Sequence, residues 1–133
     1  MYAEMLCQSA FSFLEGASHP QSLVEQAKAL GHEAIGIADR NTVAGVVRAH
    51  VAAKAAGQRL LAGSRLVLED APDLVCYPSD RAAWARLCRL LTLGKARAPK
   101  GECLLRFEDV VAHAEGQIFI VVPPPILDDA FAA

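Results

Sequence analysis

The chain has 133 residues, a hydrophobic fraction of 53% and a formal net charge of −2. This length is enough for one small domain with a buried core, or for part of a larger domain. The near-neutral charge excludes a general electrostatic attraction of the whole chain to nucleic acid. Basic residues gather in one region, and a solvated helix face with a basic loop is favoured there over nucleic-acid contact. They are Arg81, Arg86, Arg89, Lys95, Arg97, Lys100 and Arg106.

The four cysteines are far apart in the sequence and form no CxxC pair; they are Cys7, Cys76, Cys88 and Cys103. Without paired ligand spacing, a structural zinc site is not expected. Neither a signal peptide nor a long apolar run is evident. We therefore expect a reduced, cytoplasmic protein with no membrane partner.

The first half of the chain predicts two strands joined by a helix, followed by a second helix and a third strand. Ser18 is a candidate cap for the first helix and Gly31 a candidate stop. The small, apolar run before Asp39 is typical of a strand covered on both faces. Asn41 or Thr42 is a candidate start for the second helix, and Gly63 suggests a bulge in the third strand. The expected strands are residues 2–8, 34–38 and 59–69, and the expected helices are residues 18–30 and 42–57.

The second half predicts strands at residues 74–77 and 117–122 and helices at residues 81–93 and 107–114. Gly94 is the expected end of the longer helix, and Trp84 is expected in its apolar stripe, with Val110 and Val111 facing inward from the shorter helix. Alternating strands and helices predict an α/β fold with mostly parallel strands and right-handed crossovers. In such folds, sites lie at the carboxyl ends of strands.

Three motifs carry a resemblance to a known family. They are SAFSFLEGASHPQSLVEQAKALGHEAIGIADRNTVAGVVRAHVAAKAAG, LLAGSRL and LVCYPSDRAAWARLCRLLTLGKARAPKGE. Together they resemble the N-terminal PHP (polymerase and histidinol phosphatase) domain of bacterial C-family DNA polymerases. The runs EGASHP, AGVVRAHVAAKAAG and LCRLLTLGKARAPKGE most resemble the error-prone, DnaE-type polymerases rather than the replicative polymerase III alpha subunit.

This resemblance implies a distorted α/β barrel with flanking helices, of which residues 1–133 would be about the first half. The polymerase domains, with their Mg²⁺-binding palm, would lie outside this chain, so the piece itself is not expected to transfer nucleotides. By resemblance, the partners of the full-length protein are DNA, accessory mutagenesis proteins and the sliding clamp.

Active members of the family bind divalent metals at several strand ends. The matching positions in this chain are Leu6, Gln8, Glu15, Asp39, Arg40 and Arg65. Leucine has no donor atom, a glutamine amide is a poor ligand for Zn, Mn or Fe ions, and an arginine repels a cation. We therefore expect no metal and no other cofactor in this piece. In its place we expect an ion-pair cluster in which the two arginines neutralise the two carboxylates.

Less specific interpretations of these and other residues remain open. Asp39 is also suited to ending its strand and capping a turn, and Glu15 to accepting from backbone donors in its loop. His19 reads as a cap or loop residue, and His50 as a packed or solvent-facing helix residue. Ser12 and Ser18 lack the His and Asp partners of a nucleophile.

Three classes of function remain. The first is a degenerate PHP module that provides structure and interactions to an error-prone polymerase active in damage-induced mutagenesis and translesion synthesis. The second is an active metal-dependent phosphoesterase or 3′–5′ exonuclease, and the third is a small independent α/β binding protein. A half barrel would also leave strand 117–122 with an apolar, unpaired edge, so we expect self-association through that edge.

Overall fold

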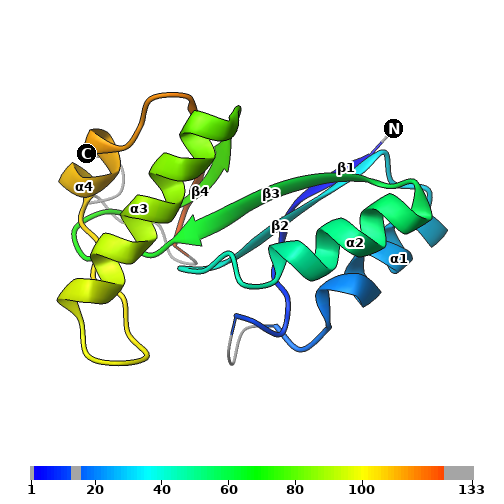
Figure 1. Cartoon of the computed structure of the whole chain (residues 1–133), viewed down its shortest axis with the longest axis horizontal. Helices are drawn as coiled ribbons and strands as arrows, with labels where there is room; N and C mark the ends of the chain where they lie inside the picture. Colours follow the sequence, from blue (N-terminus) through cyan, green and yellow to red (C-terminus); the bar gives the residue numbers. More distant parts are fainter. Residues whose placement is uncertain (1, 13–15, 125–133) are drawn as a thin grey trace. The chain divides into compact units, whose positions relative to one another are not determined.

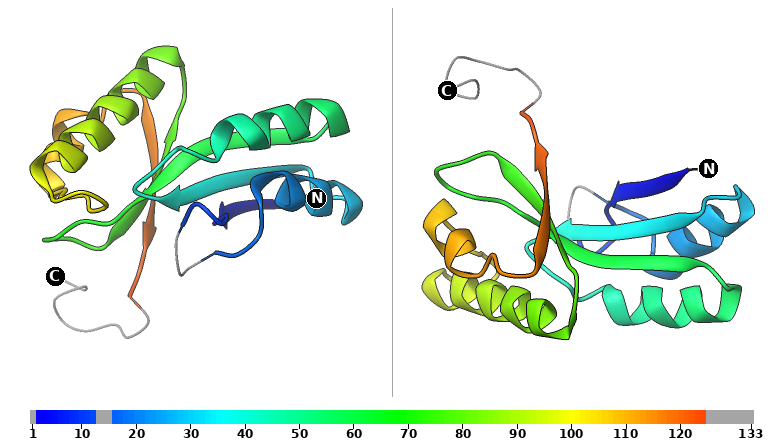
Figure 2. Two further views of the ribbon diagram at one scale, coloured as in Figure 1. Left: turned by 60° about the horizontal axis from the view of Figure 1, so that its bottom comes forward. Right: turned by 90° about the horizontal axis from the view of Figure 1, so that it is seen from above.

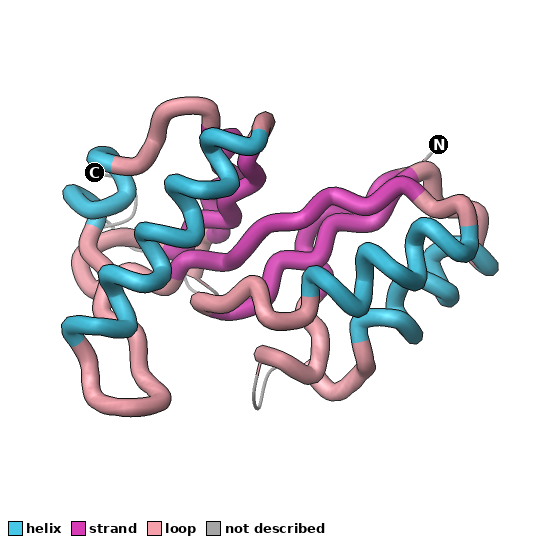
Figure 3. Tube along the Cα trace, in the orientation of Figure 1, coloured by secondary structure: helices cyan, strands magenta, loops and turns pink. Residues whose placement is uncertain are grey.

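The computed structural model describes residues 2–12 and 16–124 (Figure 1). Within these residues, five strands and four helices follow the order β1-α1-β2-α2-β3-β4-α3-α4-β5. Figure 3 shows the same elements along the Cα trace. The chain divides into two compact units, Met1–Ser64 and Arg65–Ala133. The predicted α/β class is confirmed, and every expected strand and helix is present.

The first unit is built on strands that take the order β1-β2-β3. Strands β1 (Ala3–Cys7) and β2 (Ala34–Arg40) are parallel, and their register shifts between Glu4 and Cys7. The arrowheads of β2 and β3 (Arg59–Leu66) point the same way in Figure 1. Parallel neighbours need a crossover, and the helices α1 (Pro20–Ala29) and α2 (Val46–Ala56) supply it.

The core of the first unit lies between β2 and these two helices. β2 is buried from Ala34 to Asp39, as expected for a strand made of small apolar residues. Alanines on both helices allow close approach to the strand. The core residues are Val24, Ala27, Ile35, Ile37, Ala49 and Ala53. This packing fixes the carboxyl end of β2, where Asp39 lies.

Both helices of the first unit begin later than the sequence predicted. The N-cap of α1 is His19, without a side-chain cap, while the carbonyl of Ser18 accepts from the amide of Ala10 at 2.7 Å. α2 begins after Gly45, because Asn41 adopts a left-handed conformation with φ 51° and turns the chain. Gly45 is buried, and a Cβ there would lie 3.1 Å from Asp39 Oδ2. The segment before α2 is therefore shaped by the end of β2.

The second unit contains the antiparallel pair β4 (Asp73–Pro78) and β5 (Gln117–Val122), an exception to the mostly parallel pattern that the sequence predicts. The register runs from Asp73 opposite Val122 to Pro78 opposite Gln117. Helices α3 (Arg81–Arg97) and α4 (Phe107–Ala112) connect the two strands and lie on one side of them (Figure 2). Asp80 caps α3 by accepting a hydrogen bond from the amide of Ala83 at 2.7 Å.

The predicted end of α3 at Gly94 is wrong, because the helix continues to Arg97. Gly94 is buried, and a Cβ on it would lie 2.6 Å from Cys103 Sγ. Its carbonyl accepts a hydrogen bond from the amide of Leu104 at 2.9 Å. This glycine therefore allows the segment after the helix to pack closely against it, and does not stop the helix.

Several smaller expectations also differ from the structure. β3 runs through Gly63 without a break and ends at Leu66, and Val111 is exposed. β5 agrees with the apolar edge expected for strand 117–122, since its Ile118 and Val121 are 59% and 54% exposed. Within the described residues, none of the helices is both long and apolar enough to cross a membrane.

Candidate functional site

A cluster of buried polar side chains lies at the end of β2 in the first unit. We call Ser9, Ser12, Asp39 and Ser64 the Asp39 cluster. All four residues are buried, and Asp39 is only 2% exposed. A buried carboxylate needs hydrogen-bond donors to offset the loss of its hydration, so its partners define what the cluster can do.

Three donors bind the carboxylate of Asp39. The amide of Ser9 donates to Oδ1 at 2.6 Å, and the hydroxyl of the same residue donates to Oδ2 at 2.7 Å. The hydroxyl of Ser12 donates to Oδ1 at 2.8 Å. Both carboxylate oxygens are therefore occupied, and each bond to the ionised group is worth about 1.5–3 kcal/mol.

The serine hydroxyls also accept hydrogen bonds, which fixes the direction of each O–H. Ser9 Oγ accepts from the amide of Phe11 at 3.2 Å, and Ser12 Oγ accepts from the amide of Arg40 at 2.9 Å. Ser64 on β3 donates to the backbone carbonyl of Asp39 at 2.8 Å. The cluster thus joins the loop after β1 to the ends of β2 and β3.

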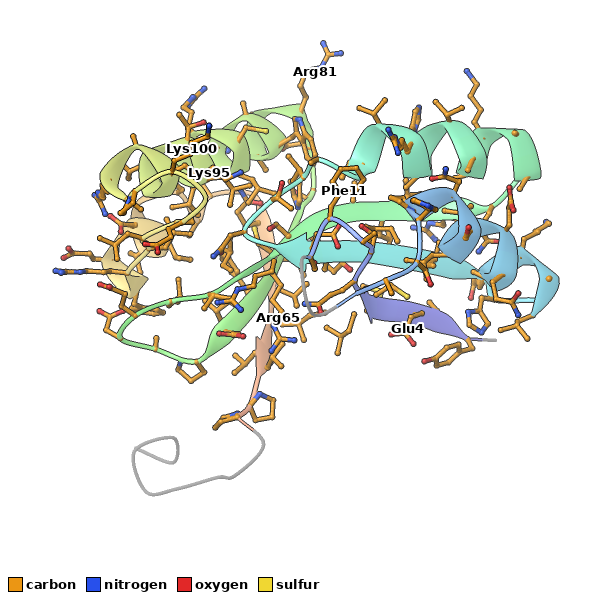
Figure 4. All side chains as sticks on the ribbon, turned by 90° about the horizontal axis from the view of Figure 1, so that it is seen from below. Glu4, Phe11, Arg65, Arg81, Lys95 and Lys100 are labelled. Atoms are coloured by element: carbon orange, nitrogen blue, oxygen red, sulfur yellow. The ribbon has the colours of Figure 1, made fainter. Side chains whose placement is uncertain are left out.

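This arrangement is suited to holding the loop in place and not to nucleophilic catalysis. The protons of both loop serines are already donated to Asp39, and a nucleophile would need a base that takes its proton and returns it. The ring of Phe11 in the same loop lies under the guanidinium of Arg48, which is 5.6 Å from the ring centroid. Figure 4 labels Phe11 in this loop. The loop is therefore fastened at three of its residues.

Leu6 and Gln8 match the two family ligand positions at the end of the first strand. Leu6 is 47% exposed and carries no donor atom. Gln8 lies directly before Ser9, and its Nε2 is buried without a hydrogen-bond partner among the described residues. An amide nitrogen has no lone pair available for a metal, so this atom is not a ligand.

Arg65, one of the two arginines at family ligand positions, has a different partner from the carboxylates of the expected ion-pair cluster. Arg65 binds Asp73 within the second unit, with Nε and Nη2 at 2.9 and 2.8 Å from Oδ2. The Asp39 carboxylate accepts hydrogen bonds from Ser9 and Ser12, where we expected bonds from a guanidinium. Arg40 is exposed at the end of β2, and Glu15 lies outside the described residues.

The residues present do not fit the divalent metals that the family's active members bind. In residues 2–12 and 16–124, no group of three or more His, Cys, Asp or Glu side chains comes together in a way that could hold an ion. Imidazole, the ligand that Zn, Mn and Fe ions favour, is missing from the positions that would supply it. Asp39 accepts two hydrogen bonds on Oδ1 and one on Oδ2, so an ion would have to compete with these donors for the carboxylate.

Sequence reasoning missed two serines and one glycine of this site. Ser9 and Ser64 carry no motif signal, because a single serine near a strand end is common. Gly45 is explained only by its neighbours: a Cβ there would lie 3.0 Å from Pro20 Cγ and 3.1 Å from both Asp39 Oδ2 and Phe11 Cδ2. One feature of the sequence does indicate this contact: Ser9 and Ser12 follow β1, the strand that pairs with β2.

Comparison with known proteins shows the family to which the chain belongs. The PHP domain family model matches residues 4–125, so the chain belongs to the PHP domain family. Its relatives include error-prone DNA polymerases. The chain is 54% identical over 132 residues to the error-prone DNA polymerase of Caulobacter vibrioides. The aligned region covers 98% of this chain and 12% of that protein. The chain is 55% identical over 122 residues to error-prone DNA polymerase 3 of Agrobacterium fabrum, covering 92% and 11%.

Solved structures with the same fold are longer than this chain. A candidate metal-dependent phosphoesterase from Bifidobacterium adolescentis superposes with a TM-score of 0.58 at 24% identity, over 86% of this chain and 44% of the other. An amidohydrolase from Chromobacterium violaceum, solved with bound sulfate and no metal, gives a TM-score of 0.61 at 20% identity, over 72% and 34%. The chain thus has the fold of part of a PHP-type α/β barrel, as predicted.

Proposed function

We propose that this chain is the N-terminal part of the PHP domain of an error-prone DNA polymerase, which acts in damage-induced mutagenesis and translesion synthesis. The chain spans about a tenth of the length of the curated relatives that it matches, so polymerisation belongs to segments outside it. Those segments would bind Mg²⁺, the sliding clamp and accessory mutagenesis proteins. The 133 residues themselves provide structure and interaction surfaces and catalyse no reaction.

The observation that supports a non-catalytic role is the set of donors around Asp39. A metal ligand must present a free lone pair to the ion, whereas Ser9 and Ser12 direct three hydrogens at this carboxylate. The serine hydroxyls can rotate away, but the amide of Ser9 is fixed by the backbone. Binding of an ion at Asp39 would therefore require the Ser9 hydroxyl to turn away from Oδ2, while Oδ1 would keep its bond to the amide.

The carboxylate has a structural role in this proposal. It replaces the bonds that a metal would make between strand ends with hydrogen bonds between the loop after β1 and the end of β2. Hydrogen bonds of this kind need no cofactor, so the folded state of the domain is independent of metal supply. The rest of the polymerase is then supported by a scaffold that keeps its shape without ions.

Elemental analysis of protein purified without chelators tests the non-catalytic role. We expect Zn, Mn and Fe far below one ion per chain. The same preparation, incubated with added Mn²⁺ or Zn²⁺ and a DNA primer that ends in a mismatch, is expected to release no nucleotide. Stoichiometric metal, or nucleotide release that follows the purified protein, would contradict the proposal.

The assignment to a polymerase has a separate test. The DNA that flanks the coding segment is expected to continue the reading frame into polymerase domains. The protein encoded by that frame should extend a primer past an abasic site in the template. A frame that stops at Ala133 would favour a small independent binding protein instead.

A further inference from the structure

Helix α3 and the turn after it are unusually basic. Between residues 81 and 100 the chain has six basic residues and no acidic residue. The whole chain has a net charge of −2, so this positive charge is local. The sequence alone favoured a solvated helix face, because it could not separate basic residues that are already paired from those that are not.

The structure makes that separation. Arg86 donates to the carbonyl of Glu115 at 3.0 Å and lies 3.5 Å from its carboxylate, and Arg97 binds Asp109 at 2.6 Å. These two arginines fasten α3 to the segment that follows it. The others on α3 are exposed and make no ion pair with any described residue; they are Arg81, Arg89 and Lys95.

The three unpaired residues share one side of the helix. At about 100° per residue, Arg89 and Lys95 lie within about 80° of Arg81, on opposite sides of it. The buried face is on the other side of the helix and consists of Ala83, Leu87, Leu90, Leu91 and Gly94. Figure 4 shows Arg81 pointing away from the start of α3, with Lys95 and Lys100 near its far end. We call Arg81, Arg89 and Lys95 the α3 basic face.

We propose that the α3 basic face binds the phosphate backbone of DNA without reading its sequence. This inference rests on the proposed function, in which the domain is part of a protein that handles DNA. From Arg81 to Lys95 the helix advances about 21 Å, which is about six base pairs along a duplex. The residues near these charges are small enough for a DNA backbone to approach closely. Ala82, Thr92 and Ala96 are exposed, and Ala85 is half-buried.

The composition of the face favours phosphate over an acidic protein surface. Protein interfaces depend on a central apolar or aromatic anchor, and none of the exposed residues on this side of α3 is large and apolar. Guanidinium and ammonium groups without such an anchor are suited to an electrostatic partner with regularly spaced charges. The phosphate backbone of DNA carries such regularly spaced negative charges.

The test measures the salt dependence of DNA binding. The protein that the complete gene encodes is compared with a triple variant, Arg81→Gln, Arg89→Gln and Lys95→Gln, in titrations of a fluorescent, mixed-sequence duplex from about 50 to about 200 mM salt. Each lost phosphate contact lowers the slope of log K against log salt by about 0.9, so we expect the slope to fall by about 2 to 3.

A second triple variant is the matched control. Lys28→Gln, Lys54→Gln and Arg59→Gln remove the same charge from exposed positions of the first unit. We expect this control to keep the wild-type slope. Circular dichroism verifies that both variants are folded, since all six positions are exposed.

Equal slopes for the two variants would overturn the proposal, and so would binding of poly-glutamate that is lost in the α3 variant while DNA binding is unchanged. Either result would leave the assignment to the PHP family and the non-catalytic role unaffected. Stoichiometric metal or nucleotide release would instead contradict the proposed function and leave the DNA-binding result standing.

Discussion

Ser9 binds both carboxylate oxygens of Asp39, with its amide on Oδ1 at 2.6 Å and its hydroxyl on Oδ2 at 2.7 Å. Two donors from one residue hold the carboxylate in a single orientation. Because both residues are buried, the loss of either partner would leave polar groups without water or a substitute. The contact therefore fixes where the loop after β1 meets the end of β2.

Replacing this carboxylate should destabilise the chain strongly. Asp39→Ala leaves the Ser9 amide buried without an acceptor and is expected to lower the free energy of unfolding by about 3 kcal/mol or more. Ser12→Ala removes the hydroxyl's hydrogen bonds to Asp39 and from the amide of Arg40, and should cost about 1–3 kcal/mol. Urea denaturation measures both. Glu25→Ala, an exposed carboxylate on α1, is the control and is expected to change stability by less than about 0.5 kcal/mol.

Gly94 allows a different prediction, because helix propensity and packing oppose each other there. Alanine is favoured over glycine inside a helix by about 1 kcal/mol. The added Cβ would however lie 2.6 Å from Cys103 Sγ and 2.7 Å from Leu105 Cδ2. We expect Gly94→Ala to be destabilising by about 1–3 kcal/mol in urea denaturation. Stabilisation would show that the segment after α3 moves freely enough to make room.

The ion pair between Arg97 and Asp109 predicts a dependence of stability on pH. The hydrogen bond from Arg97 holds the pKa of the Asp109 carboxyl below its ordinary value of 3.8. The ionised carboxylate therefore stabilises the folded chain above pH 3.8, and this contribution is lost as the pH falls through the folded pKa. Asp109→Asn should be destabilising at neutral pH, and its difference from wild type should shrink below pH 3.8.

Denaturation over a pH series measures this difference. Glu102→Gln, an exposed carboxylate in the same unit, should show little difference from wild type at any pH. If the effect of Asp109→Asn were the same at every pH, the ion pair would not be the source of the stabilisation.

Cys76 is expected to resist thiol reagents. It is buried on β4, and burial raises the pKa of its thiol to about 12. Its Sγ donates to Oε1 of Gln117 on β5 at 3.3 Å. Because the thiolate is the reactive form, iodoacetamide should modify Cys76 only after unfolding, as read by peptide mass spectrometry. Modification of the folded chain at the rate seen in urea would contradict this.

Self-association through β5 remains a prediction. Ile118 and Val121 are large apolar side chains that are more than half exposed on this strand. Sedimentation of the 133-residue chain should show concentration-dependent association, which Ile118→Lys with Val121→Lys should reduce. Val47→Lys with Val51→Lys, on the exposed face of α2, makes the same change of charge and is the control. Strictly monomeric wild-type protein at high concentration would count against the prediction.

The elements of this fold follow from the sequence, but several of their ends do not. Hydrophobic spacing predicts each strand and helix, because it reflects which faces are buried. Local propensity predicts that Gly94 ends its helix, whereas its small size is required by contacts with Cys103 and Leu105, which lie beyond that helix. Local propensity also predicts a helix start at Asn41 or Thr42, and it does not predict the positive φ of Asn41.

The candidate site was predicted in part. Asp39 was identified from its place at the end of a buried strand, and the structure confirms that it is buried there. Its partners were not identified, because the choice between arginine and serine depends on the path of the loop after β1. A guanidinium reaches far on a flexible stem, so sequence position says little about where it binds. Arg65 shows this, since it pairs with Asp73 eight residues along the chain.

The backbone amide of Ser9 limits how this domain can change during evolution. A side chain that blocks a metal ion can be exchanged by one codon, but a main-chain N–H is present whatever residue occupies the position, proline excepted. Histidines placed at positions 6 and 8 would therefore be combined with an aspartate whose Oδ1 is held at 2.6 Å by that amide. The other oxygen, Oδ2, is held by the Ser9 hydroxyl, which a point mutation can remove. A metal centre built here by mutation would thus need new ligands and would have one oxygen of Asp39 to use.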